Sequence, residues 1–310
     1  MDMQALTDRL NEAGIQYQKD VPLSELTSFR IGGPCPLVVF CSLENQLEDA
    51  AAIFRDNHTD FLVIGGGTNI LVSDNGLTFP IIRFWDQDVN VTCLQKQIIA
   101  PASARLDHVV QIAAEHGLKG INFASGIPGT IGGAVTGNAG AFGSQIGDCV
   151  AKATILTPEG DRESLSRAEL KFSYRDSLLK HTRNVLLSVV LELEPCDPGS
   201  LLKEREGILA LRREKHPDYH QEPCAGSFFK NIVQPNGVRQ AAGWFLDRAG
   251  CKGLAVGDAA VFEKHANIII NRGRATAEDV LTLAAQMKAR VEEMFGFELE
   301  PEVRLIGMDG

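Results

Sequence analysis

GINFASGIPGTIGGAVTGNAGAFGSQIG, residues 120–147, is the stretch on which the fold depends, because it is rich in glycine and contains no charged side chain. Glycine accepts positive φ angles and lets a ligand approach the backbone closely. Such a segment predicts main-chain N–H groups wrapped around an anion, and a phosphate is the expected anion. Tight turns in a β-rich domain remain an alternative. Its eight closely spaced glycines are Gly126, Gly129, Gly132, Gly133, Gly137, Gly140, Gly143 and Gly147.

A second loop of the same character favours the phosphate interpretation. The sequence GGGTNI, residues 65–70, follows the apolar run 61–64. Two anion-binding loops predict a pyrophosphate that is held from two sides. Neither G-x-G-x-x-G nor G-x-x-x-x-G-K-[ST] occurs at these positions, which argues against an ordinary Rossmann domain and against a P-loop.

Length and composition narrow the class of protein. A chain of 310 residues is long enough for two or three domains. The net charge of −10 and the absence of a Lys/Arg block argue against a nucleic-acid partner. Seven cysteines without a C-x-x-C pattern are typical of reduced thiols, and no run approaches 18 apolar residues. We therefore expect a cytoplasmic protein with no membrane insertion.

A metal site is not expected. His216 and His220 are four residues apart, which would suit a metal pair on a helix, but Pro217 between them ends helical geometry. Cys224 lies near Ser227 but has no neighbouring base in the sequence that would activate it.

The N-terminal two thirds of the chain predict alternating helices and strands. A strand at 36–40, a helix at 43–58 and a strand at 61–64 form a β-α-β unit, and the first glycine loop follows it. The other expected elements are helices at 2–14 and 106–116, strands at 81–84, 98–101, 151–156 and 185–193, and a short helix between the turn at 158–161 and Ser173.

The C-terminal third predicts a separate domain. Two prolines and a glycine make residues 195–200 the best linker candidate. Thr276 and Asp279 predict a capping box for a helix that ends at Gly296. An alternating pattern predicts a final strand at 297–305, with Leu305 on its apolar side. Further helices are expected at 201–215 and 240–249, and a buried strand at 265–271.

Individual polar residues are ambiguous when they are taken one at a time. Ser227 and Lys230 match S-x-x-K, and residues 73–75 match S-D-N, as in penicillin-binding enzymes. The chain order is reversed and K-T-G is missing, so this match is a coincidence. Arg175 in a polar turn and Glu302 on an alternating strand are each compatible with a solvated surface position.

Taken together, seven segments closely resemble the UDP-N-acetylenolpyruvoylglucosamine reductases. They occur in the family's order and span most of the chain: PLSELTSFRIGG (22–33), VIGGGTNILVSDNG (63–76), GINFASGIPGTIGGAVTGNAGAFG (120–143), SYRDS (173–177), AGSFFKN (225–231), KHANIIIN (264–271) and EPEVRLIG (300–307). The compact spacing from Tyr174 to Ser227 resembles the shorter subclass, which lacks an inserted tyrosine loop.

The resemblance implies an α+β fold with an FAD-binding domain of the vanillyl-alcohol-oxidase type, followed by a smaller α+β substrate-binding domain. We expect the first domain at residues 1–196, with subdomains of about 1–85 and 86–196, and the second at 200–310. We also expect a monomer.

The resemblance implies noncovalent FAD, because the first loop carries Thr68 and Asn69 where some relatives in the superfamily use a histidine tether. The implied FAD contacts are Gly65, Gly66, Gly67, Thr68, Asn69, Ile70, Gly126, Ile127, Pro128, Gly129, Thr130, Gly132, Gly133, Ala134, Asn138, Ala139, Gly140 and Ala141.

The family's reaction implies roles for three residues. NADPH reduces the flavin and leaves, and the enolpyruvyl sugar nucleotide is then reduced to UDP-N-acetylmuramate for peptidoglycan synthesis. Arg175 and Glu302 would stabilise negative charge on the substrate carboxylate, and Ser227 would donate a proton to C2. Implied substrate contacts are Tyr174, Lys230, Asn231, His265 and Asn267.

Some positions depart from the family's pattern. Ala102 and Ser103 stand where relatives tend to carry glycines, and Ile232 and Asn267 are less usual. Two alternatives stay open on the sequence. One is a flavin-dependent oxidase of a sugar or hydroxy acid, which would need no NADPH. The other is a colourless sugar-nucleotide-binding or structural protein.

Overall fold

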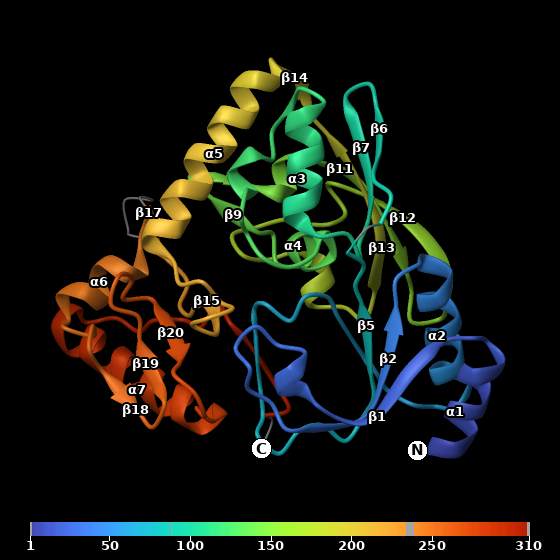
Figure 1. Ribbon diagram of the computed structural model, residues 1–310, viewed down its shortest axis with the longest axis horizontal. Coiled ribbons are helices and arrows are strands. Elements are labelled where there is room, and N and C mark those ends of the chain that lie inside the picture. The colour runs from blue at the N-terminus through green and yellow to red at the C-terminus, as the bar shows by residue number, and fades with distance from the viewer. Residues whose placement is uncertain (1, 88, 234–238, 309–310) are drawn as a thin grey trace. The chain divides into compact units, whose positions relative to one another are not determined.

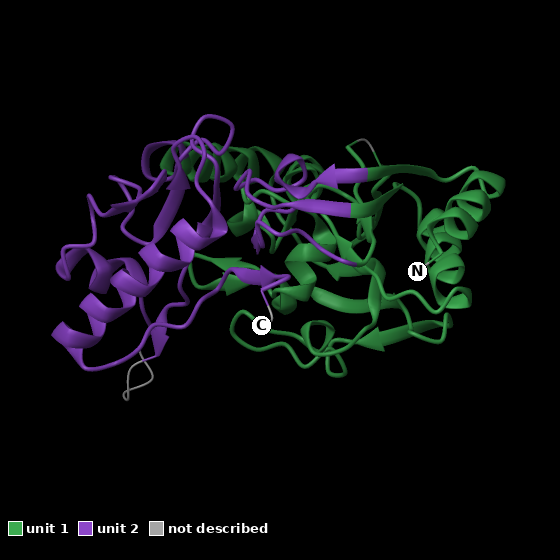
Figure 2. Ribbon diagram, turned by 90° about the horizontal axis from the view of Figure 1, so that it is seen from below, with its two compact units in different colours: residues 1–19, 36–66, 79–212 green, residues 20–35, 67–78, 213–310 purple. Residues whose placement is uncertain are grey.

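The chain forms two compact α+β units, each built from segments that are distant in sequence (Figures 1 and 2). The computed structural model describes residues 2–87, 89–233 and 239–308. Unit 1 comprises residues 1–19, 36–66 and 79–212, and unit 2 comprises residues 20–35, 67–78 and 213–310. Among the described residues, no helix has both the length and the apolar character needed to cross a membrane.

The first sheet of unit 1 contains the predicted β-α-β unit. Its strands, in spatial order, are β1 (Gln16–Pro22), β2 (Pro34–Cys41), β5 (Ile81–Phe84) and β3 (Leu62–Ile64). Strands β2 and β3 are each parallel to β5, so β5 is inserted between the two strands of the unit. Helices α1 (Met3–Glu12) and α2 (Glu44–Asp56) share the core of this sheet through Leu10 and Phe54. The predicted helices at 2–14 and 43–58 are therefore confirmed.

The second sheet of unit 1 is antiparallel. Its order is β12 (Arg162–Ser166), β11 (Val150–Leu156), β13 (Val185–Glu192), β7 (Gln97–Pro101) and β6 (Thr92–Leu94). Helices α3 (Leu106–Glu115) and α4 (Ile131–Thr136) belong to the same core. The short helix expected before Ser173 is wrong. Residues 162–166 instead pair with β11, because a strand there satisfies their backbone groups.

The remaining elements of unit 1 are small apart from one helix. Strand β8 (Leu118–Lys119) pairs with β14 (Glu194–Pro195), and β9 (Gly140–Ala141) with β10 (Ser144–Gln145). Helix α5 (Pro198–Lys215) begins inside the predicted linker, since proline is well tolerated in the first turn of a helix. The 3₁₀ helices of the described chain are η1 (Leu23–Glu25), η2 (Asn122–Ala124), η3 (Ile146–Asp148) and η4 (Leu178–Lys180).

The described part of unit 2 has a four-stranded antiparallel sheet and the two α-helices α6 (Ala242–Arg248) and α7 (Ala277–Phe295). The order is β15 (Cys224–Ser227), β20 (Ile268–Asn271), β19 (Ala259–Val261) and β18 (Ala255–Val256). Strand β16 (Ile232–Val233) pairs with β17 (Arg239–Gln240). Strand β4 (Ile70–Val72) runs parallel to β21 (Arg304–Ile306), which joins the first glycine loop to the C-terminal segment.

The predicted final strand is only partly correct. Regular pairing is confined to residues 304–306, and Phe229 forms an isolated bridge with Pro301. Proline has no N–H to donate and therefore interrupts the ladder. Leu299 and Val303 are buried as expected, but Leu305 is 40% exposed. The alternation therefore holds through Val303 and ends where residues 304–306 pair with β4, so the pattern misassigns the side chain of Leu305.

Helix α7 matches its sequence signals at both ends. The Thr276 hydroxyl accepts from the amide of Asp279, and the Asp279 carboxylate accepts from the amide of Thr276. Gly296 ends the helix with a φ of +76°. The sequence analysis did not predict a further capping residue, Asp74, which lies just after β4. Its carboxylate accepts from the amide of Ala277 at 2.8 Å. This bond fastens the segment after the first glycine loop to the helix N-terminus.

We expect Asp74→Ala to lower the free energy of unfolding by about 1 kcal/mol, because an orphan amide in the first turn of α7 loses its acceptor. Urea denaturation followed by circular dichroism measures the change. Glu278→Ala, in the same helical turn, is the matched control and should change stability by less than about 0.5 kcal/mol. Equal stability of Asp74→Ala and the control would exclude the capping role of Asp74.

Candidate functional site

The glycine-rich segment folds as a turn, helix α4 and a hairpin within unit 1, and protein acceptors bind most of the amides in its first part. The amide of Gly126 donates to Asp107 at 2.6 Å, and that of Gly133 donates to the Thr130 hydroxyl at 3.1 Å. The amides of Ile127, Ile131 and Gly132 donate to the carbonyl oxygens of Ala124, Ala104 and Ala102. Within the described chain, the amides of Gly129 and Thr130 donate to no protein acceptor. These two are the donors left in this turn for a ligand.

The glycines of the two loops serve different purposes. A Cβ atom at Gly65 would lie 2.3 Å from the Thr130 hydroxyl oxygen, so close packing requires a glycine there. Gly129 has a φ of +112°, which L side chains rarely adopt. Gly133 is exposed, and a Cβ there would meet only the Thr130 hydroxyl, at 3.6 Å. Protein packing therefore leaves open space beside Gly133, as binding of a phosphate over this turn requires.

The other predicted residues of this segment form its framework. Ala134 lies in the core, and Ile127 and Ala139 pack against it, whereas Pro128 is exposed. Gly140 and Ala141 form β9, and a Cβ at Gly140 would lie 2.6 Å from the Ser144 carbonyl oxygen.

The first glycine loop is divided between the two units. Gly65 and Gly66 follow β3 in unit 1, whereas residues 67–70 belong to unit 2. Gly67 has a φ of +64°, and its carbonyl accepts from the Ser28 amide. Asn69 donates from Nδ2 to the carbonyl of Glu302 at 3.3 Å and accepts from the amide of Arg304 at 3.0 Å. Thr68 is half-buried and Ile70 opens β4. The second half of this loop is thus bonded to the segment that carries Glu302.

An ion pair that the sequence did not indicate supports the turn at Gly126. Arg205 of α5 binds Asp107 of α3 through two hydrogen bonds of 2.6 and 2.7 Å, and the same carboxylate accepts from Gly126. Burial by itself would raise the pKa of Asp107, but the hydrogen bonds from Arg205 and Gly126 outweigh it and lower that pKa. Arg212 donates from Nε to the carbonyl of Ser125 at 2.7 Å. Arg205 and Arg212 are seven residues apart on one helix face, which is the signal that could have identified them.

Arg175 lies in a tight turn of unit 1. Ser173 and Asp176 exchange two backbone hydrogen bonds of 3.0 and 3.1 Å across it. Arg175 has a φ of +56°, and its guanidinium carbon lies 5.6 Å from the centre of the Tyr174 ring. The Lys180 ammonium donates to the carbonyl of Arg175 at 2.8 Å. Tyr174 and Arg175 are both half-buried, so this turn holds an arginine at the protein surface in a defined backbone conformation.

Ser227 and Glu302 lie on two paired segments of unit 2. The amide of Glu302 donates to the carbonyl of Phe228 at 2.7 Å, and the amide of Lys230 donates to that of Glu300 at 2.9 Å. Both Ser227 and Glu302 are half-buried. The fold therefore brings together two predicted catalytic segments from distant parts of the chain, while Arg175 belongs to unit 1.

Two of the predicted substrate contacts, Asn267 and Asn231, form hydrogen bonds within the protein. The Asn267 side chain is buried and binds both backbone groups of Phe229, at 2.8 and 2.9 Å. It therefore fixes the segment next to Ser227. The side-chain Oδ1 of Asn231 accepts from the first amide of α6, that of Ala242, at 3.1 Å. Ile232 packs against the core of unit 2.

Lys230 and His265 are the ionisable side chains among the predicted substrate contacts of unit 2. Lys230 pairs with the exposed Glu300 at 3.1 Å. Burial lowers the pKa of His265, and Lys252 and Lys215 lower it further. The imidazole is therefore a neutral hydrogen-bonding group near neutral pH, and the two lysines, which the sequence analysis did not select, provide the positive charge.

The departures at Ala102 and Ser103 have a packing explanation. Both residues are buried, and the carbonyl of Ala102 accepts from Gly132. The Ser103 hydroxyl donates to the carbonyl of Ser42 at 2.9 Å. The serine is thus accommodated by a protein acceptor, which satisfies its buried hydroxyl.

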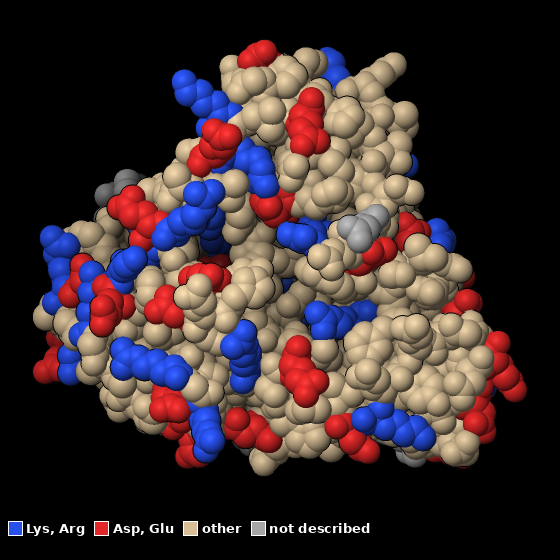
Figure 3. Space-filling model, viewed as in Figure 1, with Lys and Arg blue, Asp and Glu red and all other residues tan. Residues whose placement is uncertain are grey.

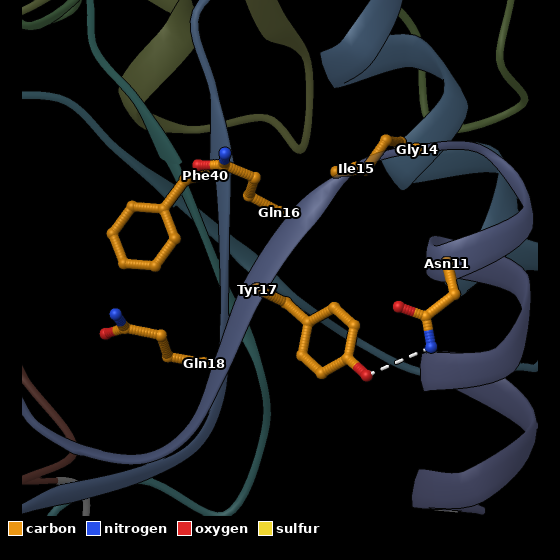
Figure 4. Close-up of a pocket in the computed structure, with 7 residues that line it drawn as sticks. All are labelled: Asn11, Gly14, Ile15, Gln16, Tyr17, Gln18 and Phe40. Carbon is orange, nitrogen blue, oxygen red and sulfur yellow. Dashed lines mark hydrogen bonds between the residues drawn. The ribbon is translucent and has the colours of Figure 1, made fainter.

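A separate hollow of about 550 Å³ lies beside α1 and β1 of unit 1 (Figure 4). Its lining includes Gln16, Phe40 and Tyr17, and the side chain of Asn11 donates to the Tyr17 hydroxyl at 3.2 Å. None of the predicted site residues lines it.

Figure 3 shows that basic and acidic side chains are interspersed over the face in view.

Comparison with known proteins matches both parts of the chain to described families. Residues 35–166 match the model of an FAD binding domain. Residues 217–306 match the model described as UDP-N-acetylenolpyruvoylglucosamine reductase, C-terminal domain.

Relatives of nearly full length carry the same name. The UDP-N-acetylenolpyruvoylglucosamine reductase of Caldanaerobacter subterraneus subsp. tengcongensis is 39% identical, over 97% of this chain and 98% of the relative. That of Caldicellulosiruptor bescii is 41% identical, over 96% and 93%. The crystal structure of UDP-N-acetylenolpyruvylglucosamine reductase from Thermus caldophilus superposes with a TM-score of 0.76 at 30% identity, covering 94% of this chain and 98% of that one.

We expect Gly133→Ala to keep or slightly raise stability, because the Cβ atom has space and alanine favours a helix. The same Cβ would obstruct a phosphate above the turn, so FAD affinity should fall by about tenfold or more. Flavin fluorescence titration of the apoprotein measures the affinity. Gly137→Ala at the other end of α4 is the control and should stay within about twofold. Unchanged FAD affinity in Gly133→Ala would exclude a phosphate at this position.

We expect Asp107→Asn to destabilise the protein at neutral pH, because Arg205 loses its charged partner in a largely buried pair. A lowered pKa in the folded state stabilises the protein above the unfolded pKa of about 3.9, and this stabilisation is lost as pH falls through the folded pKa. The difference in Tm between wild type and variant should therefore shrink below about pH 4. Asp60→Asn, in an exposed pair with Arg183, is the control and should cost less than about 1 kcal/mol. A Tm difference that does not depend on pH would contradict this account.

Proposed function

Because the chain belongs to the UDP-N-acetylenolpyruvoylglucosamine reductase family, we propose that Arg175, Ser227 and Glu302 are its catalytic groups. The protein is an FAD-dependent oxidoreductase. Its reaction is the reduction of the enolpyruvyl group of UDP-N-acetylenolpyruvoylglucosamine to give UDP-N-acetylmuramate, with NADPH as reductant. The names of full-length relatives favour this activity over an oxidase on the same scaffold. They also favour an enzyme over a structural or simple binding protein.

The pairing of residues 227–230 with residues 300–302 carries the proposal for the site. The bond from the Glu302 amide to the Phe228 carbonyl holds a hydroxyl and a carboxyl group on neighbouring backbone segments. Asn267 supports this arrangement by binding both backbone groups of Phe229. An enzyme that adds a proton next to a carboxylate needs a donor and a charge-stabilising group on adjacent, rigid positions.

In the proposed mechanism, Ser227 donates the proton that the substrate carbon C2 receives. A positioned general acid contributes about 10²- to 10⁴-fold in rate. A serine hydroxyl is a weak acid and needs a favourable electrostatic environment. Lys230, three residues further on, is the cation in the same segment, and its pairing with the exposed Glu300 orients its side chain.

Arg175 and Glu302 act on the substrate carboxylate in this proposal. Negative charge spreads onto that carboxylate as the enolpyruvyl double bond is reduced. A preorganised donor facing such developing charge is worth about 2.7 to 4 kcal/mol. The closed turn around Arg175 is the preorganising element for the arginine.

FAD, when bound, relays reducing equivalents from NADPH to the substrate. We propose that the Gly65 to Ile70 loop and the turn at Gly126 to Ala134 hold its pyrophosphate without a covalent bond. The free amides of Gly129 and Thr130 and the open space beside Gly133 support this assignment, because they offer donors and room to an anion.

We propose that the substrate's own pyrophosphate and sugar bind Lys230, Asn231 and His265 of unit 2, and that Tyr174 is a further substrate contact. The positive charges of Lys215 and Lys252 near His265 support an anion at that position.

We further propose that the enzyme works as a monomer in the cytoplasm. All seven cysteines are free thiols, as is usual in a reducing compartment. Sedimentation or size-exclusion measurements in the presence of FAD test the oligomeric state.

We expect Ser227→Ala to leave reduction of the flavin by NADPH unchanged within about twofold. Reoxidation of the reduced enzyme by the enolpyruvyl sugar nucleotide should slow by about 10²- to 10⁴-fold, because the proton donor is gone. Anaerobic stopped-flow absorbance of the flavin separates the two half-reactions.

Ser144→Ala, at an exposed strand position, is the matched control and should leave both rates unchanged. If Ser227→Ala slowed both half-reactions equally, Ser227 would not be the proton donor. Rapid reoxidation by air without the sugar nucleotide would instead favour an oxidase.

A further inference from the structure

Asn138 is a buried polar residue whose side-chain groups are used by the protein itself. It follows α4, is 1% exposed and has a φ of +45°. Its Nδ2 donates to the Ser173 carbonyl at 2.6 Å and to the Gln145 side chain at 3.0 Å. Its Oδ1 accepts from the Gly147 amide at 3.0 Å. Both amide hydrogens therefore have protein acceptors, which leaves none for a direct bond to a cofactor.

One of these acceptors belongs to the turn that carries Arg175. Ser173 is the first residue of that turn and exchanges two backbone hydrogen bonds with Asp176. On the other side of the turn, the Ser177 hydroxyl donates to the carbonyl of Thr136 at 2.7 Å, and Ser177 is buried. The two flanks of the turn are thus bonded to the end of α4 and to the residue that follows the cap.

The backbone conformations make these bonds specific. Asn138 and Arg175 both lie in the left-handed region, where asparagine is tolerated because its side chain can bond locally. An arginine there is held by its surroundings, since the conformation costs free energy for a residue with a Cβ atom. The bond from Asn138 to Ser173 is 2.6 Å long, slightly shorter than the 2.7 Å bond from Ser177 to Thr136.

We propose that Asn138 is a positioning residue for Arg175, acting through the Ser173 carbonyl and not through contact with the flavin. This inference rests on the catalytic role of Arg175 proposed above. Without the Nδ2 donor, the Ser173 carbonyl keeps only the bond from the Asp176 amide, so the turn is no longer fastened to Asn138 and can shift. A misplacement of about 1 Å of a group that orients the substrate can cost about 10²-fold in rate.

The test is Asn138→Asp, which keeps the size of the side chain, the acceptor for Gly147 and the tolerance of positive φ. Its carboxylate repels the Ser173 carbonyl, so the bond is broken. We expect flavin reduction by NADPH and the FAD dissociation constant to stay within about twofold of wild type. Reoxidation by the enolpyruvyl sugar nucleotide should slow by about 10- to 100-fold. Asn138→Gly, which also permits the backbone conformation, should give the same pattern and serves if the first variant folds poorly.

Gln145→Ala is the matched control, because Gln145 binds the same Asn138 amide, and its other side-chain hydrogen bond within the described residues goes to Asp148 and not to the turn of Arg175. Both half-reactions should remain within about twofold. The decisive measurement combines Asn138→Asp with Arg175→Ala. If Asn138 acts through Arg175, the double variant should be no slower than Arg175→Ala alone.

Weakened FAD binding with equal loss of both half-reactions in Asn138→Asp would overturn the inference and make Asn138 a cofactor or folding residue. A further slowing in the double variant would also overturn it, while leaving the role of Arg175 intact. An Arg175→Ala enzyme with normal reoxidation would instead overturn the catalytic role of Arg175, and the positioning role with it.

Discussion

Hydrogen bonds from backbone amides to protein acceptors fix the conformation of the glycine-rich turn at residues 126–133. Five amides between Gly126 and Gly133 donate to protein groups, and the amides of Gly129 and Thr130 do not. A glycine-rich sequence therefore does not mean that all its amides face a ligand. Most of them fasten the turn to its neighbours, and this leaves a small number of donors in fixed directions, as anion binding requires.

Charged and amide side chains around the site also bind backbone groups of neighbouring segments. Asp107 accepts both from Arg205 and from the Gly126 amide, so one carboxylate ties α3, α5 and the turn together. Asn267 binds the backbone of Phe229 as a neighbouring strand would, and Asn138 joins two segments of unit 1. Buried amide groups of this kind fix the backbone beside a site because their loss would leave unpaired polar groups.

Many elements could be predicted from local patterns. The capping box at Thr276, the stop at Gly296 and the β-α-β unit are signals that depend on nearby residues, and the structure confirms them. The short helix before Ser173 failed because pairing with β11 decides the state of residues 162–166. Leu305 failed because the alternation ends after Val303, where residues 304–306 pair with β4. Both errors arose where a partner strand outweighed local preference.

The sequence by itself determined the positions of the two glycine loops, the residue types of the proposed site and the resemblance to a family. Each of these depends on a short motif of neighbouring residues. Only the tertiary structure decided which of those residues already have protein partners. Asn138 and Asn267 looked like ligand contacts, yet their amide groups bind backbone atoms of residues 35 and 38 positions away. Hydrogen bonds between residues so far apart in the chain form only when the segments fold together. Local sequence patterns therefore do not reveal them.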